Sequence, residues 1–146
     1  MSMGKQLVTR RIINFFLPDR VRSFASSVVL NPTIDYEEFE KYRKEHSKSV
    51  VIVDVRDPDE LISPGAISGT VNVPLGEIAN AFGELNVNEF SAKYGVEKPN
   101  ATDPLVFFCL KGIRSQSAMD TVKALGFSNT ANYVGSYLDW AEKNKS

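Results

Sequence analysis

The chain has 146 residues, 42% of them hydrophobic and 24% charged, which predicts one folded domain, and it holds no run of the ~20 apolar residues that span a bilayer. Its one cysteine excludes an internal disulfide framework, and one cysteine with one histidine leaves little for a zinc site, so we expect no metal and no organic cofactor. The net charge of −1 conceals an asymmetry: residues 1–29 carry five cations and one acid, whereas residues 30–146 carry 12 cations and 17 acids and show no basic surface for nucleic acid.

The first 29 residues have the composition of a mitochondrial targeting segment. They are rich in arginine, almost free of acids and hydroxylated toward their end, and the stretch Arg22–Ser26, "RSFAS", resembles a presequence cleavage site. Arg10 and Arg11 interrupt the apolar core that a secretory signal would need. We therefore expect a targeting segment at residues 1–29, a domain at residues 30–146 and a mitochondrial location. The alternatives are an ordinary basic arm or an amphipathic surface helix on a cytoplasmic protein.

The body of the chain alternates helical and strand-like segments. Residues 33–46 predict a helix, because Asp35 is a candidate N-cap with Glu38 three residues later. Residues 49–55 form a short β-branched run that predicts a buried parallel strand. The remaining segments predict strands at residues 66–74, 105–109 and 129–135, and helices at residues 75–82, 86–96, 115–125 and 136–145. This order predicts the α/β class, with a central parallel sheet covered by helices on both faces.

The only cysteine, Cys109, ends the apolar strand "LVFFC" and precedes a predicted helix. Ligands of such sheets bind beyond the carboxyl ends of the strands, and backbone N–H groups at a helix N-terminus favour an anion. Lys111 and Arg114 follow closely, and Gly112 lets the loop curl. We expect a charged, solvent-reachable thiolate. A free cysteine also commonly fills a core, and composition alone leaves that alternative open.

No general base lies near the cysteine in the sequence. The only histidine, His46, falls at the end of the first predicted helix and is interpreted as a solvated residue, which disfavours a Cys–His hydrolase. The chemistry must then need only an anionic sulfur and a cradle that binds an anion. The spacing of Cys109 and Arg114, with four residues between them, favours catalysis over core filling.

Four separated motifs resemble the rhodanese-like sulfurtransferases. The segment "CLKGIRS" is similar to the active-site loop of that family, "VIVDVRDPDE" to its early strand and turn, "GAISGTVNVP" to its Gly-His-Ile-Pro-Gly box and "NYVGSYLDW" to its closing Gly-x-x-x-Trp element. The resemblance runs from about Ile34 to Lys143 and implies a rhodanese-like domain. Ala66 stands where the box usually has His, and Ser68 where it often has Pro, and these departures concern the local structure there more than the chemistry.

The resemblance implies a two-step sulfur transfer. Cys109 would attack a donor such as thiosulfate, become a persulfide, and pass the sulfur to cyanide, glutathione or a protein thiol. Lys111 and Arg114 would orient the donor, and Asp54 and Arg56 would support the site. The remaining loop residues would complete the substrate cradle: Leu110, Gly112, Ile113 and Ser115. Nothing in the sequence indicates an oligomeric state.

Several alternatives accompany this interpretation. Arg114 could pair with an acid such as Asp54 instead of binding the donor, and Tyr137 and Trp140 are expected in the core. A Cys-dependent phosphatase is disfavoured, because related phosphatases place five residues between Cys and Arg, and the loop here holds four and no acid for the leaving group. A rhodanese-like domain could also serve as a sulfur carrier or interaction module without turnover of its own.

Overall fold

A computed structural model of the chain describes residues 28–145 and shows a five-stranded parallel sheet. The strands are β4 (Thr33–Ile34), β5 (Val51–Asp54), β6 (Val71–Asn72), β7 (Leu105–Phe108) and β8 (Thr130–Tyr133), in the spatial order β4-β8-β7-β5-β6. The helices are α3 (Tyr36–Glu45), α4 (Pro58–Ile62), α5 (Ile78–Gly83), α6 (Val87–Tyr94), α7 (Ile113–Ala124) and α8 (Ser136–Lys143), with a 3-10 turn at Leu75–Glu77. The expected targeting segment lies outside the described residues, except for its last two positions.

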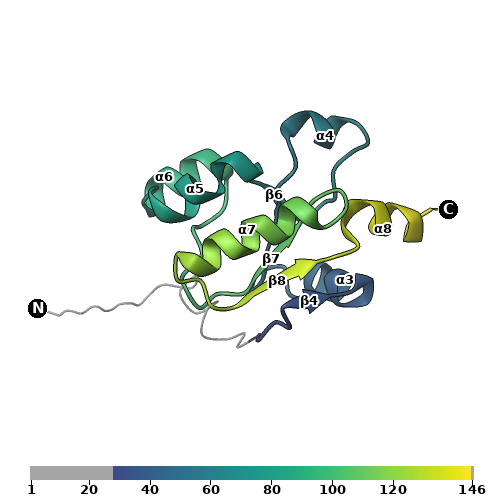
Figure 1. The fold of residues 1–146 in the computed structure, drawn as a ribbon, viewed down its shortest axis with the longest axis horizontal. Coiled ribbons are helices and arrows are strands. Elements are labelled where there is room, and N and C mark those ends of the chain that lie inside the picture. The colour runs from purple at the N-terminus through teal and green to yellow at the C-terminus, as the bar shows by residue number, and fades with distance from the viewer. Residues whose placement is uncertain (1–27, 146) are drawn as a thin grey trace, which may run out of the picture.

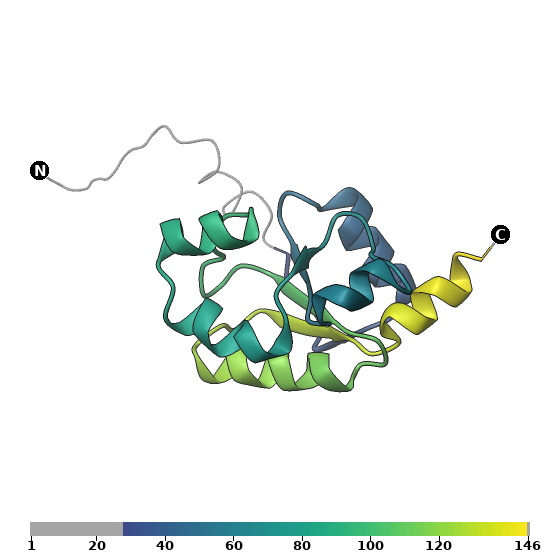
Figure 2. The ribbon, with the colours of Figure 1, turned by 90° about the horizontal axis from the view of Figure 1, so that it is seen from above.

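The helices form one layer on each face of the sheet, as predicted. Helices α5, α6 and α7 cover one face, and α3 and α8 cover the other (Figures 1 and 2). The central position of β7 explains why its sequence is apolar without interruption. Leu105 and Phe107 pack into the core below α5, α6 and α7, whereas Val106 and Phe108 pack into the core below α3 and α8. Within residues 28–145, no helix is both long and apolar enough to cross a membrane.

The predicted helix at residues 33–46 begins later than expected, because its first residues belong to the sheet. Thr33 and Ile34 pair with β8 as the edge strand β4. Asp35 then caps α3 by accepting from the Glu38 N–H at 2.9 Å, while the Glu38 carboxylate accepts from the Asp35 N–H. The capping box was therefore predicted correctly, but the segment before it was wrongly assigned to the helix.

Three further boundaries differ from the prediction near the site. Residues 66–70 form a loop, and only Val71–Asn72 pair with β5. Arg43 on α3 anchors this loop by donating to the carbonyl and hydroxyl oxygens of Ser68, each at 3.1 Å. Strand β7 ends at Phe108, so Cys109 lies just beyond the strand, and α7 begins at Ile113 rather than at residue 115.

Candidate active site

The sulfur of Cys109 lies inside the turn between β7 and α7. Its Sγ accepts hydrogen bonds from the Gly112 N–H at 3.1 Å and from the Ser115 N–H at 3.4 Å, and Ser115 Oγ lies 3.4 Å away. Gly112 has a φ of +93°, and a Cβ there would collide with the Val134 carbonyl. Glycine is therefore required at this position for the loop to wrap around the sulfur.

Burial and hydrogen bonding act on the thiol in opposite directions. Burial raises the pKa of Cys109, but hydrogen bonds from Ser115, Gly112 and Lys111 outweigh it and bring the pKa below its ordinary value. The cysteine is only 1% exposed, so the expectation of a solvent-reachable sulfur is wrong for this closed loop. The loop amides that stabilise a thiolate also cover it, and a reactant must enter through the mouth of the loop.

Arg114 pairs with Glu60 of α4 and not with Asp54. Its Nη1 and Nη2 atoms lie 2.8 and 3.0 Å from the two carboxylate oxygens of Glu60, a bidentate pair. The Arg114 hydrogen bond chiefly lowers the pKa of Glu60, to about 2. The Glu60 carboxylate also accepts from the Asp57 N–H at 3.0 Å, so it is held from two sides. The acid expected near the loop is therefore present but comes from α4.

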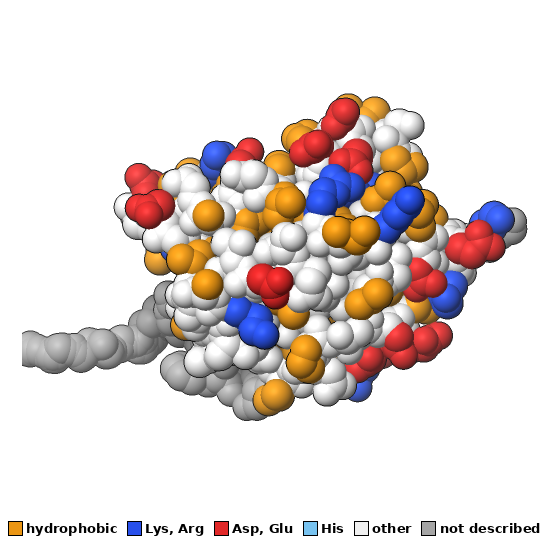
Figure 3. Space-filling model, viewed as in Figure 1, with side chains coloured by type: hydrophobic (Ala, Val, Ile, Leu, Met, Phe, Trp, Pro, Cys, Tyr) orange, Lys and Arg blue, Asp and Glu red, His pale blue; other side chains and the backbone are white. Residues whose placement is uncertain are grey.

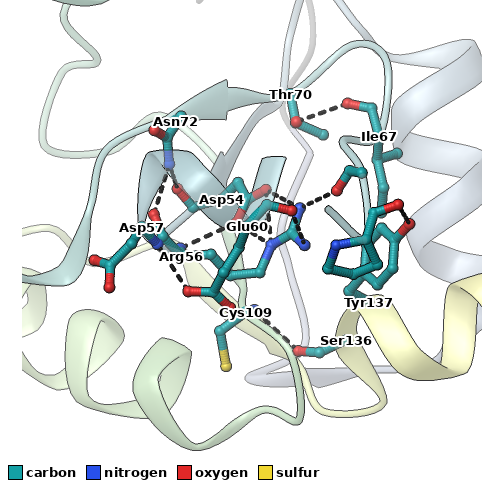
Figure 4. Close-up of polar contacts among 12 residues, drawn as sticks. Asp54, Arg56, Asp57, Glu60, Ile67, Thr70, Asn72, Cys109, Ser136 and Tyr137 are labelled. Atoms are coloured by element: carbon teal, nitrogen blue, oxygen red, sulfur yellow. Dashed lines mark hydrogen bonds and ion pairs between the residues drawn. The ribbon is translucent and has the colours of Figure 1, made fainter. Parts of the chain in front are cut away.

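Asp54 and Arg56 form a buried ion pair at the carboxyl end of β5. Arg56 Nη2 lies 2.7 Å from Asp54 Oδ2, and both side chains are almost fully buried. The guanidinium also donates to the Gly65 carbonyl at 2.9 Å and lies 4.4 Å from the centroid of the Tyr137 ring. Figure 4 shows the Cys109 side chain pointing away from this pair. The pair therefore holds the surrounding loops rather than the sulfur itself.

The first turn of α8 holds the other side of the cysteine. Ser136 Oγ accepts from the Cys109 N–H at 3.1 Å and donates to the Tyr133 carbonyl at 2.7 Å (Figure 4 draws the first contact). The Tyr137 N–H donates to the Cys109 carbonyl at 2.9 Å. Ser136 has a φ of +59°, an uncommon value for a residue other than glycine, and it is fully buried. Both backbone polar groups of Cys109 are thus fixed by one distant turn.

The mouth of the loop combines cations with apolar side chains. Lys111 is exposed, and the fraction of Ile113 that is exposed is 75%. Ile62, at the end of α4, is 85% exposed. Figure 3 shows Lys and Arg atoms gathered where α4 faces the start of α7, with acidic atoms beside them and hydrophobic side chains around them. Leu110 is half-buried, and Lys111 is the exposed cation of the loop between β7 and α7.

The structure brings the predicted loop residues together and adds three that the sequence did not indicate: Glu60, Asn132 and Ser136. Glu60 left a weak signal, because it lies three residues after Asp57 in a capping box. Asn132 is a buried polar residue within β8, where an apolar side chain would be expected. Ser136 left none. Among residues 28–145, no group of three His, Cys, Asp or Glu side chains could hold a metal ion.

Relatives of known name match most of the chain. A Schizosaccharomyces pombe protein, whose name proposes a mitochondrial thiosulfate sulfurtransferase, is 42% identical over 130 residues, covering 86% of this chain and 89% of its own. A Saccharomyces cerevisiae protein named thiosulfate:glutathione sulfurtransferase is 36% identical over 105 residues, covering 72% of this chain and 74% of its own.

Solved structures and family models agree with these relatives. The structure of the human single-domain sulfurtransferase TSTD1 superposes with a TM-score of 0.71 and 33% identity, and the match covers 80% of this chain and all of that one. The family model described as the rhodanese-like domain matches residues 35–143. This match covers nearly the whole described chain, and the order of the parallel strands and the cysteine loop before α7 agree with it. The chain therefore belongs to the family of rhodanese-like domains.

Proposed function

We propose that the chain is a thiosulfate sulfurtransferase, which moves a sulfane sulfur from thiosulfate or a persulfide to cyanide or a thiol through a persulfide on Cys109. The observation that carries the proposal is a solitary sulfur whose hydrogen-bond donors are the backbone N–H groups of its own loop. Its lowered pKa favours the nucleophilic thiolate. The names of the relatives, one of which includes glutathione, agree with this chemistry.

The transfer can be written without a cofactor. The Cys109 thiolate attacks the outer sulfur of thiosulfate, an S–S bond forms to Sγ, and the original S–S bond breaks with its electron pair on sulfite. The charge balances, since a thiolate and a dianion give a persulfide anion and a dianion. In the second step, a thiolate or cyanide attacks the outer sulfur, and the Cys109 thiolate leaves. The loop N–H groups stabilise an anion on the enzyme in both steps.

The cations at the mouth have different tasks in this proposal. Lys111 is exposed and draws a dianionic donor toward the loop. Arg114 is already paired with Glu60, so it meets the donor with much of its charge neutralised. The pair also keeps the guanidinium beside the sulfur, and the two charges interact: the pKa of Arg114 is raised first by Glu60 and further by the Cys109 thiolate. Leu110 and Ile113 are assigned to the apolar wall of the entrance.

Intact mass spectrometry of the protein treated with thiosulfate tests the reaction class. We expect a gain of one sulfur atom, which cyanide removes with formation of thiocyanate. The matched control is Cys109→Ser, which preserves size and should show neither the gain nor any thiosulfate:cyanide turnover. Turnover retained by Cys109→Ser would remove the proposed nucleophile. A sulfur gain without turnover on cyanide or glutathione would identify a carrier instead of an enzyme.

We further propose that residues 1–29 direct the protein to mitochondria. The support is the arginine-rich, acid-poor composition of this segment and the mitochondrial designation in the name of the S. pombe relative. The segment precedes the domain in the sequence, and the first hydrogen bond that ties the described chain to the fold involves the Val28 carbonyl.

A further inference from the structure

Asn132 is a buried polar residue on β8 that the sulfur-transfer steps do not use. It is 2% exposed, and its Oδ1 lies 2.6 Å from Ser115 Oγ. Its Nδ2 donates to the Gly112 carbonyl at 3.1 Å and to Gln116 Oε1 at 3.2 Å. Because Ser115 Oγ lies 3.4 Å from Cys109 Sγ, a continuous series of hydrogen bonds joins the sulfur to β8.

The groups at the ends of this series of hydrogen bonds determine which atom is the donor in each bond. A backbone carbonyl such as that of Gly112 only accepts, so the amide nitrogen of Asn132 must face it and the amide oxygen must face Ser115. Gln116 agrees, because its Nε2 donates to the Asp120 carboxylate at 3.0 Å and leaves Oε1 to accept. A serine hydroxyl has one hydrogen. While the sulfur is a thiol, Asn132 receives this hydrogen and the Ser115 oxygen presents its lone pairs to the sulfur. The Ser115 side-chain hydrogen bond that lowers the pKa of Cys109 therefore forms only when the hydrogen turns from Asn132 to the thiolate.

The three states of the sulfur respond differently to this arrangement. A thiol donates its S–H to Ser115 Oγ, so every group has a partner. A thiolate can only accept, and Ser115 can reach it only by turning its hydrogen away from Asn132, which leaves a buried amide oxygen without a donor. In a persulfide the charge lies mainly on the outer sulfur, so the hydrogen of Ser115 can return to Asn132. The free thiolate is the one state that the series opposes.

We propose that Asn132 is a positioning residue: by holding the single hydrogen of Ser115, it destabilises the free thiolate of Cys109 relative to its persulfide and so favours the sulfur-loaded enzyme. The part that concerns the persulfide rests on the proposed sulfurtransferase function, whereas the effect on the thiol does not. The backbone N–H groups of Gly112 and Ser115 stabilise an anion, and Asn132 opposes them only while the charge is on Sγ.

Charged groups lie in the cysteine loop and on three of the elements around it, and the Asp54–Arg56 pair among them is on the side from which the sulfur points away. They are Lys111 in the loop, Arg114 on α7, Glu60 on α4 and the Asp54–Arg56 pair at the end of β5. The main variants below replace only neutral residues with neutral ones and leave this set of charges unchanged. A shift in the pKa of the Cys109 thiol then reflects a change in the hydrogen bonds to it.

The first measurement is the thiol pKa, obtained from the rate of alkylation by iodoacetamide as a function of pH. Asn132→Val, which suits a strand but accepts no hydrogen bond, should free the Ser115 hydrogen and lower the thiol pKa by about one unit. Asn132→Ala, a smaller replacement with the same expected shift, is used if circular dichroism shows that the valine variant does not fold.

The second measurement shows whether the effect passes through Ser115. In a Ser115→Ala background, Asn132→Val should leave the thiol pKa unchanged, because the hydrogen for which Asn132 and the sulfur compete is gone. A general loosening of the loop would shift the pKa equally in both backgrounds. An equal shift in both, or none in either, would overturn the role of Asn132.

The third measurement concerns loading with sulfur. At a fixed ratio of thiosulfate to sulfite, and at a pH above both thiol pKa values, the equilibrium constant for persulfide formation should fall about tenfold in Asn132→Val. An unchanged constant beside a lowered thiol pKa would overturn the preference for the loaded state. If the unaltered protein takes up no sulfur at all, the sulfurtransferase function fails, and the alkylation data still decide how Asn132 acts on the thiol.

Discussion

At the scale of single residues, the chemistry depends on small groups that no larger side chain can replace. Gly112 supplies both a φ of +93° and an N–H that lies 3.1 Å from the sulfur, while the Val134 carbonyl occupies the space where a Cβ would be. Ser115 supplies one N–H and one hydroxyl. Both residues therefore act directly on the pKa of Cys109, through hydrogen bonds to its sulfur.

Gly112→Ala tests the first of these requirements. The variant should displace the loop, weaken the N–H contact with Cys109 and raise the thiol pKa by about one unit, with at least a tenfold loss of sulfur transfer. The matched control is Gly126→Ala, whose φ of +103° is equally left-handed but whose Cβ would meet no atom within 4 Å. The control should lose about 1 kcal/mol of stability and keep its thiol pKa, as thermal unfolding and iodoacetamide titration can show. Equal thiol titrations in the two variants would contradict the assigned role of Gly112.

At the scale of elements, one ion pair ties the short helix α4 to α7. Helix α4 spans only Pro58–Ile62 and buries none of its residues, so its position depends on contacts such as Glu60–Arg114. The pKa of Glu60 is lowered to about 2, chiefly by Arg114. A carboxylate with a lowered folded-state pKa adds stability above its unfolded pKa, and this stability is lost as the pH falls toward the folded value.

Glu60→Gln should therefore destabilise the protein in a way that depends on pH. At pH 7 we expect a loss of about 1 kcal/mol, a moderate value because the pair is partly exposed. The difference from the unaltered protein should shrink as the pH falls from about 5 toward 2, since the original carboxylate is then protonated as well. Urea unfolding at several pH values measures it, and Asp59→Asn removes a neighbouring exposed acid as the control. A pH-independent difference would mean that the ion pair is not the cause.

The sequence predicted those elements whose signals are local. The alternation of strands and helices, the capping box at Asp35 and the contiguous cysteine loop were all recognisable and were confirmed as structure. Strand β4 was missed because its two residues are held by partners about 100 positions away, which periodicity cannot reveal. The partner of Arg114 and the contacts of Asn132 are missing from the prediction for the same reason, since they join elements that meet only in the folded chain.

At the scale of the whole molecule, the described chain is attached to the fold from its first residue. The Val28 carbonyl accepts from the Asn129 amide at 2.6 Å, and the Leu30 N–H donates to Asn129 Oδ1 at 2.9 Å. Leu30 itself is buried in the core below α3 and α8. A boundary at residue 30 would therefore remove one contact that the domain uses, so truncations are best made before Val28.

Removal of residues 1–27 tests the proposed targeting. A fluorescent fusion that starts at Val28 keeps the Asn129 contacts and should lose mitochondrial localisation, whereas the full chain fused in the same way should keep it. Replacing Arg10 and Arg11 by glutamine in the full chain is the matched control for charge, and import should fall without any change in length. The same distribution for all three fusions would refute the presequence.

The Cys109 N–H donates to Ser136 Oγ and the Tyr137 N–H donates to the Cys109 carbonyl, so the last helix of the described chain positions the backbone of the cysteine. These contacts come from α8, 27 positions after the cysteine, so the backbone of Cys109 is held on both sides only when the last helix has packed against the sheet. Displacement of α8 would therefore free the backbone of Cys109, while the groups that lower the pKa of its sulfur all lie before α8 in the chain.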